Sequence, residues 1–227
     1  LNIRRFVACL CFLFATEFVA MASASADETL TMGVFAYRPD SVLQERYQPL
    51  TDYLSRETGI SVRLEVLNQE NMSRAIAANR LDFFLTNPSH FLLIRSERSL
   101  TGVLATLVRR SGQSSTGSLG GVIFTRAERD DIEQLADIRD KTIASPGVHF
   151  LGGYQTQVLE LMDAGIDIRR VNLIRFMGTH DRVVRSVLSG DADVGFIRTS
   201  ILEQMAQEDP DLFTKVKVLN RQRLAGF

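Results

Sequence analysis

The sequence predicts an α/β protein of two lobes. From residue 29 onward, short apolar runs that fit strands alternate with stripes of helical period, which is typical of α/β folds. This pattern restarts after a polar stretch at residues 110–118, which marks the expected boundary between the lobes. The length of 227 residues is enough for one large domain or two small lobes.

In the first lobe, apolar residues at helical spacing follow the first strand. Leu43, Tyr47, Leu50 and Leu54 define a helical stripe that Gly59 ends in the position that favours a left-handed residue. Pro88 suits the first turn of another helix, where its missing N–H is not needed. We expect strands at 29–36, 60–67, 81–85 and 104–108, and helices at 43–58, 71–79 and from 88 onward.

In the second lobe, glycines again follow the helical stripes, at positions 165 and 190. Residues 78–85 and 189–196 resemble each other, since each leads from a helix end through a tight turn to an apolar strand. We expect strands at 119–125, 141–144, 172–176, 192–197 and 215–219, and helices at 132–138, 154–164, 181–189 and 200–207.

The composition excludes several classes of protein. There are 26 basic and 27 acidic residues, for a net charge of −1, and 45% of residues are hydrophobic. This balance argues against a disordered chain and against nucleic-acid binding through bulk positive charge.

Residues 1–26 are predicted to be a signal peptide for export to the periplasm. The competing interpretation is a membrane anchor, but Glu17 breaks the apolar run before the ~20 residues that span a bilayer. Both cysteines lie in this segment, so the mature chain would have none. The features of the segment are Arg4 and Arg5, the apolar run 6–14, Cys9 and Cys11, and small residues at 22–26.

No catalytic motif is evident in the sequence. It contains no nucleophile elbow, no phosphate-binding P-loop and no His-x-x-x-His pair. We therefore expect no enzymatic activity, no metal site and no cofactor.

Polar loops follow the carboxyl ends of the predicted strands, where open α/β sheets bind ligands. Helix amino termini there present unpaired N–H groups and partial positive charge, which suits an anion. The alternative is that Ser, Thr and Asn simply cap the helices. These loops are 37–40, 86–90, 145–153, 178–181 and 198–200.

The charged and aromatic residues of these loops favour a ligand site. All three histidines of the chain, His90, His149 and His180, fall in the loops, where each can donate a hydrogen bond or pair with an anion. Arg38 and Arg198 present forks that match oxyanions, although either can instead pair with Asp40 or Asp193. Beside His180, Asp181 would repel an anion unless it accepts from a ligand amine or caps its helix.

Three segments resemble the periplasmic phosphate/phosphonate-binding proteins. They are Leu-Asp-Phe-Phe-Leu-Thr-Asn-Pro at 81–88, Phe-Met-Gly-Thr-His-Asp-Arg-Val-Val at 176–184 and Gly-Asp-Ala-Asp-Val-Gly at 190–195. Within that family the chain is most similar to extracytoplasmic sensor domains of tetrathionate-sensor-type histidine kinases, through residues 48–54, 86–90 and 195–199.

The resemblance implies a type II periplasmic-binding-protein fold with a central mixed sheet in each lobe. The lobes would be residues 27–112 and 113–198, with 199–227 as an incomplete segment returning to the first lobe. Closure on ligand would pivot at 110–118 and at a second crossover near Arg198 and Thr199. Ligand contacts are expected at Tyr37, Arg38, Asn87, Ser89, His90, Phe91, Ser145, His149, Gly152, Gly153, Thr179, His180, Asp181, Arg198 and Thr199.

The function expected from these observations is that of a sensor module for a small oxyanion. It would be the input domain of a two-component histidine kinase, whose transmembrane and catalytic regions would be its partners. The alternative is the substrate-binding protein of a phosphate- or phosphonate-type ABC transporter, with a permease as partner. The gene sequence beyond Phe227 would separate the two.

Overall fold

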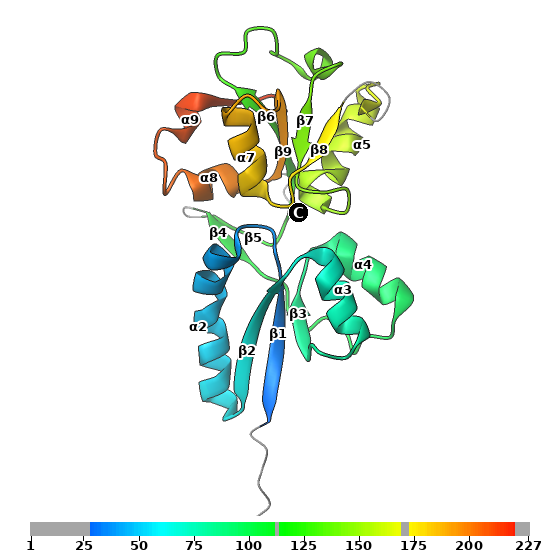
Figure 1. Ribbon diagram of the computed structural model, residues 1–227, viewed down its shortest axis with the longest axis vertical. Coiled ribbons are helices and arrows are strands. Elements are labelled where there is room, and N and C mark those ends of the chain that lie inside the picture. The colour runs from blue at the N-terminus through cyan, green and yellow to red at the C-terminus, as the bar shows by residue number, and fades with distance from the viewer. Residues whose placement is uncertain (1–27, 112–113, 169–172, 221–227) are drawn as a thin grey trace, which may run out of the picture.

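The computed structural model describes residues 28–111, 114–168 and 173–220. These residues form two lobes stacked end to end, with the hairpin of β4 (Arg109–Ser111) and β5 (Ser114–Thr116) between them (Figure 1). The predicted signal peptide, residues 1–26, lies outside the described residues. Within the described part of the chain, no helix combines the length and apolar character needed to cross a membrane.

In the part of the chain that the structure describes, the first lobe is a three-stranded sheet covered by three helices. Its strand order is β2-β1-β3, and both pairs are parallel. α2 covers one side of the sheet, and α3 and α4 lie on the other (Figure 1). The elements are β1 (Thr29–Phe35), α2 (Asp40–Thr58), β2 (Ser61–Leu67), α3 (Gln69–Ala77), β3 (Phe83–Leu85) and α4 (Pro88–Glu97).

The three described strands of this first sheet run parallel, whereas a mixed sheet was expected. The order of the helices and strands along the chain explains why these strands are parallel. α2 joins β1 to β2 and α3 joins β2 to β3, and each helical crossover returns the chain in the same direction.

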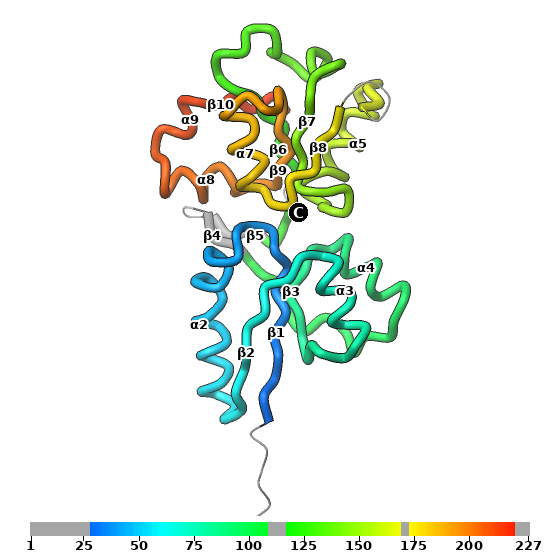
Figure 2. Tube along the Cα trace, in the orientation of Figure 1, coloured from blue at the N-terminus to red at the C-terminus, as the bar shows by residue number. Residues whose placement is uncertain are grey.

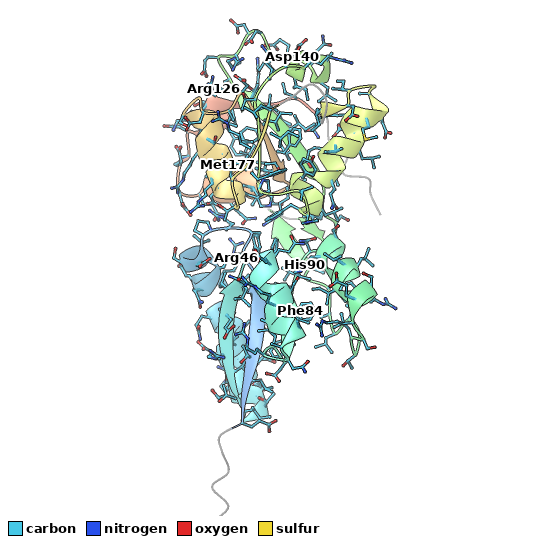
Figure 3. All side chains as sticks on the ribbon, turned by 45° about the vertical axis from the view of Figure 1, so that its right-hand side comes forward. Arg46, Phe84, His90, Arg126, Asp140 and Met177 are labelled. Atoms are coloured by element: carbon cyan, nitrogen blue, oxygen red, sulfur yellow. The ribbon has the colours of Figure 1, made fainter. Side chains whose placement is uncertain are left out.

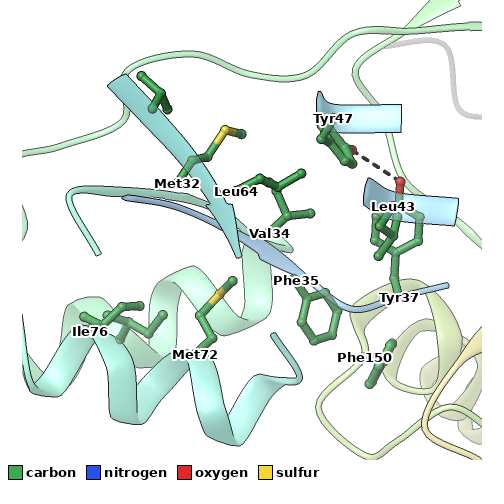
Figure 4. Close-up of a cluster of buried hydrophobic side chains, with 12 residues drawn as sticks. Met32, Val34, Phe35, Tyr37, Leu43, Tyr47, Leu64, Met72, Ile76 and Phe150 are labelled. Carbon is green, nitrogen blue, oxygen red and sulfur yellow. Dashed lines mark hydrogen bonds between the residues drawn. The ribbon is translucent and has the colours of Figure 1, made fainter. Parts of the chain in front are cut away.

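The core of the first lobe lies between this sheet and its helices (Figure 4). Met32 and Val34 of β1 pack with Leu43 of α2 and Met72 of α3, and all four are almost completely buried. α2 ends at Gly59, whose φ of 72° is the left-handed conformation expected from the sequence. These contacts hold the carboxyl end of β1 toward the second lobe.

The second lobe contains a five-stranded sheet in the order β10-β6-β9-β7-β8. β6 runs antiparallel to β9 and β10, while β7 is parallel to β8 and β9, so this sheet is mixed as predicted. The elements are β6 (Gly121–Arg126), η1 (Leu135–Ile138), β7 (Ile143–Ser145), η2 (Leu151–Gly153), α5 (Gln155–Asp163), β8 (Ile174–Phe176), α7 (His180–Leu188), β9 (Val194–Arg198), α8 (Ile201–Met205), α9 (Leu212–Lys215) and β10 (Val216–Val218).

The strand predicted at 104–108 is wrong. Residues 101–108 have no regular secondary structure, and the side chains of Leu104 and Val108 are 83% and 60% exposed. A strand needs a neighbouring strand to accept and donate its backbone hydrogen bonds, and sequence period alone does not supply one.

The described part of the segment expected to return to the first lobe, residues 199–220, instead belongs to the second. β10 pairs with β6, and Ile201, Leu212 and Val216 are buried in the second lobe's core. Burial of these apolar side chains favours this position. In the described ranges, α8 and α9 stay in the second lobe (Figure 2), so the expected second crossover near Arg198 and Thr199 is not present there.

Candidate functional site

The loops that follow β1, β7, β8 and β9 meet where the two lobes face each other. Two contacts fix this meeting point. The ring centroids of Phe35 and Phe150 lie 4.9 Å apart, and the backbone N–H of His180 donates to the carbonyl of Tyr37 at 3.2 Å. With the guanidinium of Arg198 over the ring of Tyr37, four of the five loops predicted from the sequence are adjacent, and they belong to different lobes.

Arg38 and Asp181 form a buried ion pair across the lobes. The Nε atom of Arg38 lies 2.9 Å from Oδ1 of Asp181, and Nη2 lies 2.8 Å from Oδ2, while the two side chains are 2% and 4% exposed. The hydrogen bonds to Asp181 are the largest influence that raises the pKa of Arg38. Arg38 thus pairs with Asp181 rather than with Asp40. The carboxylate of Asp181 is therefore paired with a cation of the protein itself.

Arg198 lies over the ring of Tyr37 at the end of β9. Its guanidinium carbon is 4.7 Å from the ring centroid, and its Nη1 donates to the carbonyl of Thr199 at 2.9 Å. The expected alternative partner of Arg198, Asp193, pairs with Arg129 instead. Arg198 is 4% exposed, so its charge is held inside the contact between the lobes.

The phenol of Tyr37 is tied to α2. Its hydroxyl lies 3.3 Å from that of Tyr47 (Figure 4). It also accepts from Nη1 of Arg46 at 3.1 Å. Burial raises the pKa of Tyr37, but the Tyr47 hydrogen bond and the charges of Arg198 and Arg46 outweigh it, so the pKa is lowered. Figure 3 shows Arg46 at the end of the first lobe that faces the second.

His180 is the first residue of α7 and is 2% exposed. Its ring stands edge-on to Phe150, with 5.5 Å between the centroids and 85° between the planes. Thr179 caps the helix by accepting from the N–H of Arg182 at 3.4 Å, as the capping alternative predicted. The start of α7 therefore places the imidazole of His180 at the contact between the lobes, while the backbone N–H groups of His180 and Arg182 are paired within the protein.

The loop after β7 packs closely against these residues. The hydroxyl of Ser145 donates to the carbonyl of Gly153 at 2.9 Å. A Cβ on Gly152 would lie 2.8 Å from Cβ of Arg198, and one on Gly153 would lie 2.7 Å from Cε1 of His180. The two glycines are thus needed for close approach within the protein, whereas His149 in the same loop is exposed.

The loop after β3 contributes a buried histidine of a different kind. The two ring nitrogens of His90 lie 2.9 Å from the hydroxyl of Ser73 and 2.8 Å from that of Thr86. Burial, and to a lesser degree the charge of His149, lowers the pKa of His90 to about 4. His90 is therefore neutral at pH 7 and held by the first lobe's own hydroxyls.

Its neighbours in this loop have separate roles. Asn87 caps α4 by accepting from the N–H of His90 at 3.0 Å, and Phe91 is half-buried. The hydroxyl of Ser89 donates across the lobes to Oε1 of Gln155 at 2.6 Å. On the other lobe, Oγ1 of Thr199 accepts from the N–H of Gly120 at 3.2 Å and so supports the strand end.

Several residues at the contact between the lobes were not predicted from the sequence. Phe35 and Tyr47 belong to an apolar strand and a helical stripe, and both patterns indicate core rather than site. Phe150 lies in the loop predicted at residues 145–153, and this position was the one feature of the sequence that could have indicated a role for Phe150 at the site. The other residues missed in this way are Arg46, Gln155 and Gln204. In the described ranges, no group of three or more His, Cys, Asp or Glu side chains is placed to hold a metal ion.

Comparison with protein families gives one match over most of the chain. A model of periplasmic substrate-binding proteins of phosphonate ABC transporters matches residues 32–225. The tetrathionate sensor histidine kinase TtrS of Salmonella typhimurium is 27% identical over 182 residues, covering 79% of this chain and 31% of that protein. The phosphate-import protein PhnD of Mycolicibacterium smegmatis is 21% identical over 193 residues, covering 82% of this chain and 60% of that protein.

Solved structures show the same fold. PhnD1 from Prochlorococcus marinus in complex with methylphosphonate has a TM-score of 0.72 at 17% identity, covering 86% of this chain and 72% of that one. A binding protein component of an ABC phosphonate transporter from Pseudomonas aeruginosa has a TM-score of 0.67 at 11% identity, covering 86% and 65%. The α/β architecture with two lobes is therefore that of periplasmic binding proteins.

Proposed function

The chain belongs to the family of periplasmic phosphonate-binding proteins of ABC transporters, and on that premise we propose that it binds a small oxyanion between its lobes. The observation that carries this proposal is the buried guanidinium of Arg198 at the contact between the lobes, near Tyr37. A buried cation beside hydrogen-bond donors favours an anionic partner.

The charges at the site support an anion of low charge. Arg38 is paired with Asp181, while Arg198 lies over the ring of Tyr37, whose backbone carbonyl accepts from the first N–H of α7. The dipole of α7 adds a partial positive charge there without a further basic residue. We place Tyr37, His180 and Arg198 at the centre of the proposed contact set, because these three approach one another across the lobes.

The remaining predicted contacts form the surroundings of this centre in our proposal. Arg38 and Asp181 hold the lobes in register, and Ser145 and Gly153 hold the loop against His180. His90 and Asn87 stabilise the loop after β3. The other members of the surrounding set are Ser89, Phe91, His149, Gly152, Thr179 and Thr199.

We propose that the module is the periplasmic input domain of a two-component sensor histidine kinase. The support is the 27% identity to TtrS over 182 residues. The chain spans about a third of that relative, so the transmembrane and catalytic regions of the kinase are proposed partners. Because the matched family consists of binding proteins, we propose no catalytic activity for residues 28–220 and no nucleic-acid partner.

The second candidate function is that of a substrate-binding protein that delivers its anion to an ABC permease. It is favoured by the family match and by the 21% identity to PhnD. The two roles differ in their readout. A sensor predicts anion-dependent autophosphorylation of a kinase carrying this domain, whereas a transport protein predicts loss of anion uptake when the gene is deleted.

A thermal-shift screen tests the binding proposal. Phosphate, methylphosphonate, sulfate, thiosulfate and tetrathionate would each be added to the purified chain, with chloride salts at matched ionic strength as the control. At 100 times its dissociation constant, a specific ligand raises the melting temperature by about 5–10 °C for a chain of this size. If all five anions behave like chloride, the proposed function is wrong.

A further inference from the structure

The ion pair of Arg38 and Asp181 joins residues 143 positions apart and on different lobes. Two aligned hydrogen bonds connect a guanidinium fork to both oxygens of one carboxylate, and both side chains are buried. Arg38 has a second acidic neighbour in the other lobe, Glu208, whose Oε1 lies 3.7 Å away and whose side chain is 64% exposed. This end of the first lobe is therefore held by acidic groups of the second.

An aromatic contact lies close to the ion pair. Phe150 comes from the second lobe, yet its ring is buried within the first lobe's core cluster (Figure 4). It packs against Phe35 of the first lobe and His180 of the second. Separating the lobes would expose the rings of Phe35 and Phe150 to water, which is unfavourable.

Two polar contacts extend the same interface. Ser89 of α4 donates to Gln155 of α5 at 2.6 Å, and Arg46 of α2 donates to Oε1 of Gln204 in α8 at 2.9 Å. They join helices on different sides of the two sheets. All of these contacts are made between groups of the protein, so the closed arrangement needs no atom from a ligand.

We propose that the Arg38–Asp181 pair is a clasp that holds the two lobes closed before any ligand binds. The carboxylate of Asp181 accepts the two hydrogen bonds that the guanidinium fork of Arg38 could otherwise donate to an anion. Removing one member of a buried pair leaves an uncompensated charge inside the protein, and opening the lobes would return that charge to water. The clasp goes beyond the proposed anion binding, because it requires only this chain.

Distance measurement by electron spin resonance on the ligand-free protein tests the clasp. Spin labels would be attached at Glu45→Cys on the first lobe and Asp211→Cys on the second, both exposed positions, in a chain in which Ser replaces Cys9 and Cys11. The unaltered clasp predicts one short distance. Asp181→Asn keeps the side-chain shape but removes its charge. In this variant we expect a second, longer distance in more than ~10% of the molecules, which is the upper limit for a minor state.

Asp193→Asn provides the matched control. Asp193 also pairs with an arginine, Arg129, but both residues belong to the second lobe, so this change predicts no longer component. The combined exchange Arg38→Asp and Asp181→Arg recreates an ion pair and predicts the single short distance again. This variant also carries the test if Asp181→Asn does not fold.

Three results would overturn the clasp: a long distance that dominates in the unaltered ligand-free protein, an unchanged distance in Asp181→Asn, or an open charge-swapped variant. Since no anion is added, these results are independent of the thermal-shift screen. If the distance measurements contradict the clasp but an anion stabilises the chain in the screen, the proposed function is still supported.

Discussion

His90 and His180 are both buried, but their surroundings give them different roles. His90 lies between the hydroxyls of Ser73 and Thr86 within the first lobe. His180 opens α7 and packs against Phe150 where the lobes meet. We therefore expect His90 to affect stability and His180 to affect binding as well.

The first prediction concerns acid stability through His90. Its pKa in the folded chain is about 4, below the ordinary value of 6.5, so the unfolded chain binds more protons between these values. The stabilisation from keeping His90 neutral is complete above about pH 6.5 and is lost as the pH falls toward 4. Between pH 7.5 and pH 5 this amounts to about 2 kcal/mol in the free energy of unfolding.

Urea unfolding at the two pH values measures this effect. His90→Gln keeps a polar side chain but does not titrate, so its free energy of unfolding should fall by about 2 kcal/mol less than that of the original chain. His149→Gln removes only the smaller of the two influences on His90, so this variant should retain most of the pH dependence. Equal pH dependence in the original chain and in His90→Gln would show that His90 is not the titrating group.

The second prediction concerns His180 and the anion identified by the screen. If its imidazole donates to a bound oxyanion, His180→Ala removes a hydrogen bond to a charged group, which contributes about 1.5–3 kcal/mol. The dissociation constant should then rise about ten- to a hundred-fold. Calorimetric titration measures this change, and Arg56→Ala, at an exposed position in the last turn of α2, is the control. An unchanged dissociation constant in His180→Ala would remove His180 from the contact set.

At the level of helices and strands, periodicity predicted the elements that bury an apolar stripe. The helix through Leu43 and Tyr47 and its end at Gly59 are present as expected, because spacing and a left-handed glycine are local features. The strand at 104–108 and the return to the first lobe depended on partners far away in the sequence, and the described residues show neither. α9 was not predicted, because four residues give too little periodic signal.

The third prediction tests the corrected position of residues 101–108. Leu104 is 83% exposed, so Leu104→Ala should change the free energy of unfolding by no more than about 0.5 kcal/mol. Leu43→Ala, at a completely buried position of α2, should cost about 2–5 kcal/mol. Urea unfolding compares the two, and a loss above about 2 kcal/mol for Leu104→Ala would indicate a buried strand after all.

The fourth prediction concerns the end of α2. No atom lies within 4 Å of a Cβ placed on Gly59, so its replacement meets only the strain of a φ of 72°. Gly59→Ala should lower the free energy of unfolding by about 1–2 kcal/mol. Asn tolerates this conformation better than Ala, so Gly59→Asn should cost less. Equal losses in the two variants would contradict the assignment of the effect to backbone conformation.

For the whole molecule, the sequence located the loops of the candidate site but not their pairing. Each loop follows a strand, which local pattern reveals, and the strand ends of both lobes do meet. The pairing of Arg38 with Asp181 depends on how the two lobes dock. The spacing of residues along the sequence does not predict this docking. Phe150 likewise becomes part of the first lobe's core only through docking.

The central claim is that the two lobes bind one oxyanion through the buried charge of Arg198. The most direct test is calorimetric titration of the chain and of Arg198→Met with the anion that stabilises it most in the screen. Methionine retains an apolar stem over Tyr37 but removes the charge. We predict one saturable site per chain and a dissociation constant about ten- to a hundred-fold higher in Arg198→Met. Absence of a saturable site in the original chain, or equal affinity in the variant, would contradict the account.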